Sequence, residues 1–170
     1  MTTEIIQRAS AFATNAHRHQ TRNDGTPYVS HCFRVAMVIM HLFDHRDEEV
    51  VAAGLLHDTI EDCDVDYDDI LEGFGRNVAD YVAVMTKDMR LEEEIREISY
   101  DKQLEDGPWQ GRLIKLADVY DNYSDADTPL VKEKLVVRAH RILRLAESDD
   151  ELVNARTLLE TFIAGANACS

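Results

Sequence analysis

The sequence of 170 residues predicts an all-α fold of about eight helices. Apolar residues recur at three- and four-residue steps along most of the chain, which is the period of a helix with one buried face. No stretch alternates apolar and polar residues as a half-buried strand does. Several of the expected helices also begin at residues that favour helix starts, and this supports the same fold class.

The first part of the chain predicts two amphipathic helices joined by a loop. The buried face of the first helix consists of Ile5, Ile6, Ala9, Phe12, Ala13 and Ala16. A turn is expected in residues 21–27, because Asp24-Gly25 and Pro27 are strong turn formers. The second helix carries His31, Val35, Val38, Ile39 and Leu42.

The central part predicts a buried helix followed by two shorter ones. Asp47 can cap a helix over residues 50–56, which are nearly all apolar and should be buried. The next six residues, 57–62, are expected to continue this helix. A helix over 67–74 should end near Gly75, and another covers about 78–86.

The last part predicts longer helices. Residues 90–104 are highly charged and indicate an exposed helix, either an ordinary solvated one or a mobile lid within 89–105. A helix over 109–123 follows Gly107-Pro108. The next helix begins at Thr128-Pro129. Residues 148–151, Ser-Asp-Asp-Glu, fit a capping box at the start of the final helix.

Composition limits the partners that the chain can have. We expect one domain over residues 1–170, since no linker-like stretch interrupts it. The net charge of −15 argues against binding to nucleic acid or to an anionic membrane surface. The N-terminus lacks an apolar signal core. Three scattered cysteines, Cys32, Cys63 and Cys169, favour the cytoplasm, and the sequence leaves the oligomeric state open.

The strongest chemical signal is the segment His57-Asp58-Thr59-Ile60-Glu61-Asp62. Four ionisable groups directly follow a buried apolar helix, and charged groups that enter a core need pairing or a metal. On a continuing helix, Glu61 and Asp62 would face the same cavity as His57 and Asp58. The alternative is a solvated acidic helix end, which is the usual interpretation of such pairs.

Two further residues complete a possible set of metal ligands. His31 lies near the start of the second helix, and Asp118 lies inside an otherwise core-like run, where an acid is costly unless compensated. Two imidazoles and two carboxylates suit Mn²⁺, Fe²⁺ or Zn²⁺ and leave positions for water and substrate. His31 could instead be an ordinary helix-start residue, and Asp118 could be exposed.

Four segments resemble a known family. The order His…His-Asp…Asp resembles the HD-domain phosphohydrolases. Residues 22–31 (RNDGTPYVSH) are similar to the R-x-x-G-x-P-Y-x-x-H segment of stand-alone RelA/SpoT-type alarmone hydrolases, and 53–62 (AGLLHDTIED) to their A-x-L-L-H-D-x-x-E-D helix. Residues 74–87 and 114–122 resemble their F-G-x-x-V-A…T-K and K-L-A-D-x-x-x-N segments.

This resemblance implies a compact HD-domain bundle around a single manganese site. It implies hydrolysis of the 3′-pyrophosphate of guanosine tetra- or pentaphosphate alarmones, with release of pyrophosphate. It assigns the residues as follows: metal ligands His31, His57, Asp58 and Asp118; water-activating acids Glu61 and Asp62; nucleotide contacts Arg22, Lys115 and Asn122. Lys87 and Arg90 would add local positive charge.

The chain departs from the family pattern at three positions. Cys32 replaces a common proline, Asn23 replaces a basic residue, and Val119 replaces an arginine. The loss of two cations leaves room for an adenosine alarmone, a nucleoside 3′,5′-bisphosphate or the 2′-phosphate of NADPH as substrate. A non-catalytic nucleotide sensor is a third possibility, but such a protein normally has a damaged site.

Overall fold

The protein is described by a computed structural model over residues 4–167, and within that range its regular structure is helical. The α-helices are α1 (Glu4–Ala16), α2 (Val29–Met37), α3 (Glu48–Leu56), α4 (Thr59–Asp62), α5 (Tyr67–Phe74), α6 (Arg76–Met85), α7 (Glu93–Asp106), α8 (Trp109–Ser124), α9 (Pro129–Leu145) and α10 (Val153–Asn167). A π-helical segment, Val38–Leu42, extends α2, and a 3₁₀ turn, Asp150–Leu152, precedes α10. The predicted all-α fold is confirmed. Cys169 lies outside the described residues.

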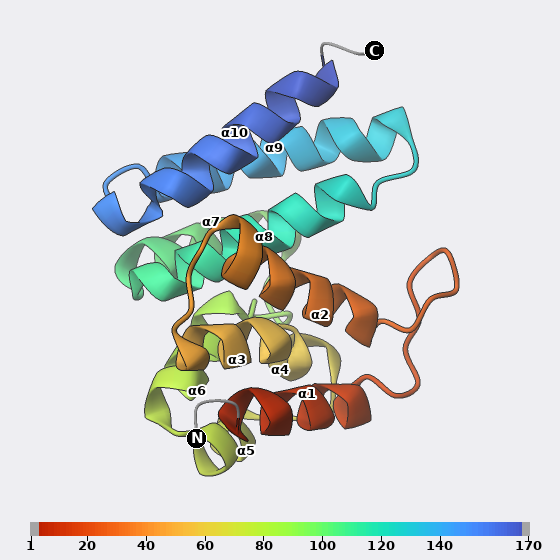
Figure 1. The fold of residues 1–170 in the computed structure, drawn as a ribbon, viewed down its shortest axis with the longest axis vertical. Helices are drawn as coiled ribbons and strands as arrows, with labels where there is room; N and C mark the ends of the chain where they lie inside the picture. Colours follow the sequence, from red (N-terminus) through yellow and green to blue (C-terminus); the bar gives the residue numbers. More distant parts are fainter. Residues whose placement is uncertain (1–3, 168–170) are drawn as a thin grey trace.

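Two central helices, α3 and α8, organise the molecule. Residues 50–56 of α3 are all buried, and α3 packs against α1, α2, α6 and α8. Figure 1 shows α1 and α5 at one end of the molecule and α9 with α10 at the other, with α2, α3 and α8 between them. No described helix is both long and apolar enough to cross a membrane.

Three predicted helix ends are confirmed by their backbone and hydrogen bonds. The Asp47 side chain accepts from the backbone N–H groups of Glu49 and Val50 at the start of α3. Thr128 caps α9 through the N–H of Val131. Gly75 ends α5 with a φ of 87°, a conformation that glycine adopts without a steric penalty.

The predicted continuation of the buried helix through residues 57–62 is wrong. Helix α3 ends at Leu56, and the chain turns at His57 and Asp58 before the single turn of α4. The reason lies in local hydrogen bonds, because His57 Nδ1 and Thr59 Oγ1 donate to the carbonyls of Gly54 and Leu56. Side chains that bond to nearby carbonyls compete with the regular helical pattern.

The predicted capping box at residues 148–151 is also wrong. Asp149 makes no cap hydrogen bond, and the chain enters a 3₁₀ turn before α10. Both carboxylate oxygens of Asp149 accept instead from the guanidinium of Arg112, at 2.6 and 2.9 Å. Arg112 is buried on α8, so an ion pair with Asp149 compensates a charge that would otherwise be costly.

Gly111 lets α8 approach α6 closely, and this gives a stability prediction. A Cβ atom at position 111 would overlap Cγ1 of Val84. We expect Gly111→Ala to destabilise the fold by about 1–3 kcal/mol through overpacking, although alanine normally stabilises a helix interior. Urea unfolding measures the change. The pair Gly111→Ala with Val84→Ala should recover part of the loss, and an unchanged or raised stability of Gly111→Ala alone would contradict the packing.

Candidate metal centre and its acids

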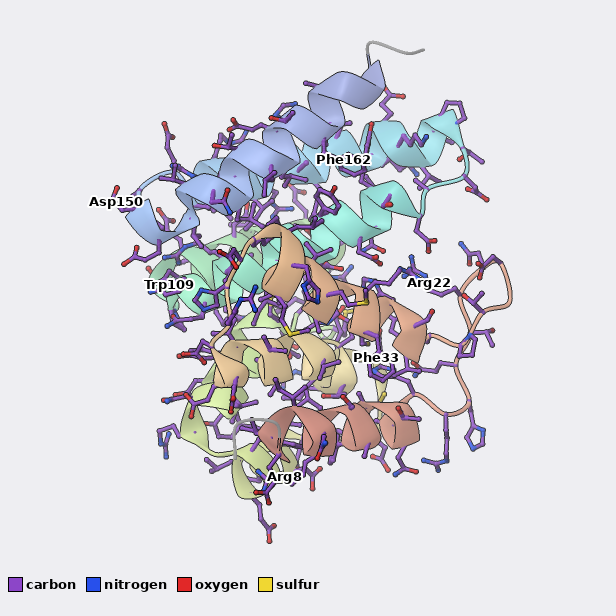
Figure 2. The ribbon with its side chains drawn as sticks, in the orientation of Figure 1. Arg8, Arg22, Phe33, Trp109, Asp150 and Phe162 are labelled. Carbon is purple, nitrogen blue, oxygen red and sulfur yellow. The ribbon has the colours of Figure 1, made fainter. Side chains whose placement is uncertain are left out.

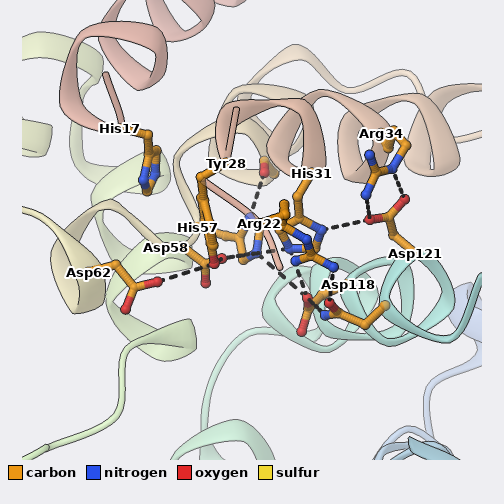
Figure 3. A network of polar contacts seen from close by, with 12 residues as sticks. His17, Arg22, Tyr28, His31, Arg34, His57, Asp58, Asp62, Asp118 and Asp121 are labelled. Carbon is orange, nitrogen blue, oxygen red and sulfur yellow. Dashed lines mark hydrogen bonds and ion pairs between the residues drawn. The ribbon is translucent and has the colours of Figure 1, made fainter. Parts of the chain in front are cut away.

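Three separate segments bring two imidazoles and two carboxylates together. His31 comes from α2, His57 and Asp58 from the turn after α3, and Asp118 from α8 (Figure 3). His31 Nε2 lies 3.2 Å from Asp118 Oδ1 and 3.6 Å from Asp58 Oδ2. His57 Nε2 lies 3.0 Å from Asp58 Oδ2 and 3.8 Å from Asp118 Oδ1. Residues far apart in the sequence therefore converge as the metal-site hypothesis requires.

Hydrogen bonds orient both imidazole rings toward the centre of this cluster. His57 Nδ1 donates to the carbonyl of Gly54 at 2.9 Å, and His31 Nδ1 donates to Asp121 Oδ2 at 2.7 Å. A carbonyl and a carboxylate can only accept, so each Nδ1 carries a proton. Each ring therefore turns Nε2 toward the cluster, and loss of the Nε2 proton to an incoming cation would give the arrangement of a metal-ligating histidine.

The two carboxylates are fixed by partners outside the cluster. Tyr28 donates its hydroxyl to Asp58 Oδ2 at 2.6 Å. Asp118 accepts from Lys115 Nζ at 2.7 Å and from Asn122 Nδ2 at 2.6 Å. Such outer partners hold ligating carboxylates in one orientation. The cluster therefore has a defined geometry before anything binds to it.

The cluster fits a small divalent cation. His57 Nε2 is fully buried and makes no well-directed hydrogen bond among the described residues, although Asp58 Oδ2 lies 3.0 Å away, and buried nitrogen atoms are rarely left so. Ligand atoms of His31, His57 and Asp118 all lie within 4.8 Å of one another. Two donors that bind one ion at about 2.2 Å are at most about 4.4 Å apart, so little adjustment is needed. Asp58 lies outside that group of three, although its Oδ2 lies near both imidazoles.

The charges of the cluster also select for a cation. Burial alone lowers the pKa of His57, but Asp58 and Asp118 raise it well above its usual value. Burial alone raises the pKa of Asp118, but Lys115 and the two imidazoles bring it well below its usual value. The pKa of Asp58 falls to about 2 in the same way, through His57. Both carboxylates are therefore ionised at neutral pH, and the raised pKa of His57 shows that they favour positive charge at the centre of the cluster, which protons on the imidazoles or a bound cation can supply.

The two acids of α4, Glu61 and Asp62, lie beside the cluster. Each carboxylate accepts one hydrogen bond from a different donor. Glu61 Oε2 accepts from the backbone N–H of Lys87 at 2.9 Å, and Asp62 Oδ2 accepts from the Tyr28 hydroxyl at 3.2 Å. Burial and the neighbouring Asp58 raise the pKa values of both acids. A carboxylate with a raised pKa is a better proton acceptor, which suits a general base.

Two of the three predicted nucleotide contacts line a cleft next to the cluster. The cleft holds about 380 Å³ and is lined by Arg22, Asn122 and Asp125, among others. Arg22 Nη2 lies 3.1 Å from Asn122 Oδ1 and 2.9 Å from Asp125 Oδ2, and Figure 2 shows Arg22 on the loop after α1. Lys115, the third predicted contact, lines a different and smaller cavity.

The sequence did not predict several residues that build this site. Tyr28 bridges Asp58 and Asp62, and Asp121 orients His31 while also accepting from Arg34 Nε at 2.7 Å. Asp121 could have been suspected, because it is a second acid within the buried run of α8. Arg90, which was expected to add local positive charge, has a side chain that is 89% exposed and pairs with Asp88.

Comparison with known proteins identifies the family. A model of the HD domain matches residues 9–107, more than half of the chain. The chain belongs to the HD-domain family. The matched residues include both histidines and both acids of α4, whereas Asp118 lies beyond them. This HD domain therefore completes its cluster with a residue from the next helix, α8.

Individual relatives agree with this assignment. The guanosine-3′,5′-bis(diphosphate) 3′-pyrophosphohydrolase MESH1 of Danio rerio is 38% identical over 128 residues, covering 72% of this chain and 69% of its own. The Aquifex aeolicus protein named guanosine-3′,5′-bis(diphosphate) 3′-pyrophosphohydrolase is 35% identical over 152 residues, which cover 88% of this chain and 20% of its own. A solved structure described as a metazoan ortholog of SpoT that hydrolyzes ppGpp aligns with a TM-score of 0.84 and 27% identity, over 96% of each chain.

The position of Tyr28 gives a prediction about metal affinity. Tyr28→Phe removes one hydroxyl that donates to both Asp58 and Asp62. We expect Mn²⁺ affinity to fall by about 10- to 100-fold, the usual cost of losing an outer partner of a ligand. Titration calorimetry with Mn²⁺ measures this loss. Tyr67→Phe is the matched control, because Tyr67 donates to Asp80 at the same 2.6 Å, and Asp80 is not part of the cluster. If Tyr28→Phe and the unmodified protein bind Mn²⁺ with equal affinity, the Tyr28 hydroxyl does not position Asp58 for the metal.

Proposed function

We propose that this HD domain is a manganese-dependent hydrolase that removes the 3′-pyrophosphate of (p)ppGpp-type alarmones and releases pyrophosphate. The observation that carries the proposal is the convergence of His31, His57, Asp58 and Asp118, with two further acids beside them. The relatives support the choice of substrate, since MESH1 and the Aquifex protein are named for this reaction and the solved homologue is described as hydrolyzing ppGpp. The scattered cysteines favour the cytoplasm as its location.

The proposed metal ligands are His31, His57, Asp58 and Asp118. A bound Mn²⁺ would lower the pKa of water and polarise a phosphoryl oxygen. Mixed nitrogen and oxygen donors suit Mn²⁺ and also Fe²⁺ or Zn²⁺. Among these residues the two imidazoles need no change of tautomer, because their Nδ1 protons are already engaged by Gly54 and Asp121.

The proposed role of Glu61 and Asp62 is to orient the attacking water and take its proton. Neither acid forms an ion pair with a cationic side chain among the described residues, so neither is neutralised by a neighbour. Each has one oxygen held by a donor, which fixes the carboxylate and leaves the other oxygen for the water. This arrangement separates the proton acceptor from the metal ligands.

The proposed nucleotide site is the cleft beside Arg22 and Asn122. Its volume of about 380 Å³ falls in the range of small-molecule sites. Asn122 touches both Asp118 and Arg22, so it connects the cleft directly to the metal centre. Arg22 also lies 6.0 Å from the centre of the Tyr28 ring, within the range of a cation–π contact.

A nucleotide panel tests the proposed reaction. Purified protein with Mn²⁺ is incubated with guanosine and adenosine tetraphosphate alarmones, a nucleoside 3′,5′-bisphosphate and NADPH, and the products are separated by ion-exchange chromatography. We expect pyrophosphate and guanosine 5′-diphosphate from the guanosine alarmone. Release of single phosphates from the bisphosphate or NADPH alone would replace the proposal with a phosphatase. Absence of turnover on the whole panel would favour a nucleotide sensor.

A further inference from the structure

Two polar side chains in the segment after α1, His17 and Gln20, contact each other near the acids of α4. His17 is 1% exposed, as buried as the two proposed imidazole ligands, and buried polar atoms need partners within the protein. Its Nδ1 lies 2.7 Å from Gln20 Oε1 and 3.3 Å from the Cys63 sulfur. The amide oxygen is both the nearer and the stronger acceptor. The proposed reaction has so far given neither His17 nor Gln20 a role.

The hydrogen bonds of Gln20 fix which end of its amide faces the acids. Gln20 Nε2 donates to the backbone carbonyl of Asp62 at 2.6 Å, and a carbonyl can only accept. The amide oxygen is thereby turned toward His17, whose Nδ1 carries the proton of that bond. The backbone of Gln20 is fixed as well, because its N–H donates to the carbonyl of His17 and its carbonyl accepts from the N–H of Tyr28, at 3.0 and 2.9 Å. Gln20 is therefore a well-fixed donor directed at Asp62.

Asp62 needs this donor because it ends a very short helix. Helix α4 has four residues, and a single helical turn is only marginally stable by itself. The last carbonyl groups of a helix have no partner within it, and at Cys63 the chain continues in an extended conformation. Gln20 supplies a donor for the Asp62 carbonyl from 42 residues earlier in the sequence. This bond connects the end of α4 to the segment between α1 and α2.

His17 also supports the carboxylate of Asp62, through Tyr28. The rings of His17 and Tyr28 stack with their centres 4.9 Å apart and an angle of 30° between their planes. The Tyr28 hydroxyl in turn donates to Asp62 Oδ2 at 3.2 Å. Figure 3 shows His17, Tyr28 and Asp62 together on the side of the cluster away from Asp118. Asp62 is therefore fixed at two points, its backbone by Gln20 and its carboxylate by Tyr28, and His17 contacts both of these residues.

We propose that Gln20 and His17 are positioning residues for the reaction: Gln20 fixes the backbone of Asp62, and His17 fixes Gln20 and the ring of Tyr28. This role rests on the proposed function, in which Asp62 helps to orient and deprotonate the attacking water. Neither residue is itself a proposed ligand or proton acceptor. A displacement of about 1 Å in a reacting group can cost about 100-fold in rate, so a small shift of α4 is enough to slow turnover.

Steady-state kinetics with Mn²⁺ and the guanosine tetraphosphate alarmone test this role. Gln20→Met keeps the length of the side chain but removes its donor, so we expect kcat to fall by about 10- to 100-fold with little change in KM. His17→Phe keeps a ring on Tyr28 and removes only the Nδ1 donor, so its loss should be smaller. Both variants should keep the thermal shift with Mn²⁺. Asn154→Leu is the matched control, because Asn154 Nδ2 also donates to a carbonyl, that of Phe43, from α10 at the end of the molecule opposite α1.

A double variant shows whether Gln20 acts through Asp62. In the Asp62→Asn background, Gln20→Met should lower kcat little further, because the carboxylate that Gln20 positions is already absent. A full additional loss would overturn the proposal, and so would a kcat of Gln20→Met equal to that of the unmodified protein. Loss of the Mn²⁺ thermal shift in Gln20→Met would also overturn it, since Gln20 would then support the metal site or the whole fold.

Amide hydrogen exchange, followed by NMR, measures the support of α4 without any turnover. The N–H groups of Asp62 and Cys63 donate to the carbonyls of Asp58 and Thr59, at 2.9 and 3.1 Å. Both amides should exchange faster in Gln20→Met than in the unmodified protein or the control, because the end of α4 opens more often. Unchanged exchange would overturn the proposal. Failure of the nucleotide panel would remove the proposed reaction, but faster exchange would still identify Gln20 as the residue that fixes Asp62.

Discussion

Asp118→Asn is expected to abolish both Mn²⁺ binding and hydrolysis while the fold persists. Asparagine keeps the volume of aspartate and its amide oxygen can still accept a hydrogen bond from Lys115 or Asn122, so packing changes little. Asparagine lacks the negative charge with which Asp118 would bind a divalent cation. Losing even an outer partner of a ligand typically costs about 10- to 100-fold in affinity, and losing a ligand itself should cost more.

Thermal unfolding with and without Mn²⁺ measures this loss. A metal at about 100 times its Kd stabilises the native state by about 2.7 kcal/mol, which for a chain of this size corresponds to a shift of roughly 5–10 °C. The unmodified protein should show the shift and Asp118→Asn should not. Asp125→Asn is the matched control, because Asp125 follows the same helix but pairs with Arg22 and Arg34. A full shift in Asp118→Asn would remove Asp118 from the metal site.

Patterns along one helix were predictable from the sequence, since they depend on local chemistry. Asp47 and Thr128 were expected at helix starts because a short polar side chain can satisfy the first free N–H groups. Asp118 was selected because an acid in a buried run must be compensated. Local chemistry alone did not predict the role of Asp149. Its carboxylate could have capped α10, but it pairs instead with Arg112, a residue distant in the sequence.

The contacts that position the side chains of the site depend on which helices pack together. Short sequence patterns do not predict this packing. Tyr28 and Asp62 are joined between the start of α2 and α4, and Arg22 and Asp125 across most of the chain. The direction of His57 also depends on a turn rather than a helix, because its Nδ1 bonds to Gly54. Residue types were therefore predicted more reliably than the hydrogen bonds that orient them.

Glu61→Gln and Asp62→Asn are expected to lower turnover by about 10²- to 10⁴-fold each, the usual contribution of a general acid or base. Both variants should keep the thermal shift with Mn²⁺, because neither acid is a proposed ligand. The amide oxygen introduced at position 61 can still accept from the Lys87 N–H, and the one introduced at position 62 from the Tyr28 hydroxyl, so the local structure should remain. Activity of either variant close to that of the unmodified protein would contradict the assigned role.

The pH dependence of turnover identifies which acid takes the proton. A base acts when ionised, so the rate should rise with pH through its pKa, which burial and Asp58 place above the usual carboxyl value for both residues. The variant at the true base should lose this rise, whereas the variant at the orienting acid should keep it at a lower rate. Because the two acids would act on one water, the double variant should be little worse than the poorer single variant. Additive losses would mean that Glu61 and Asp62 act in separate steps.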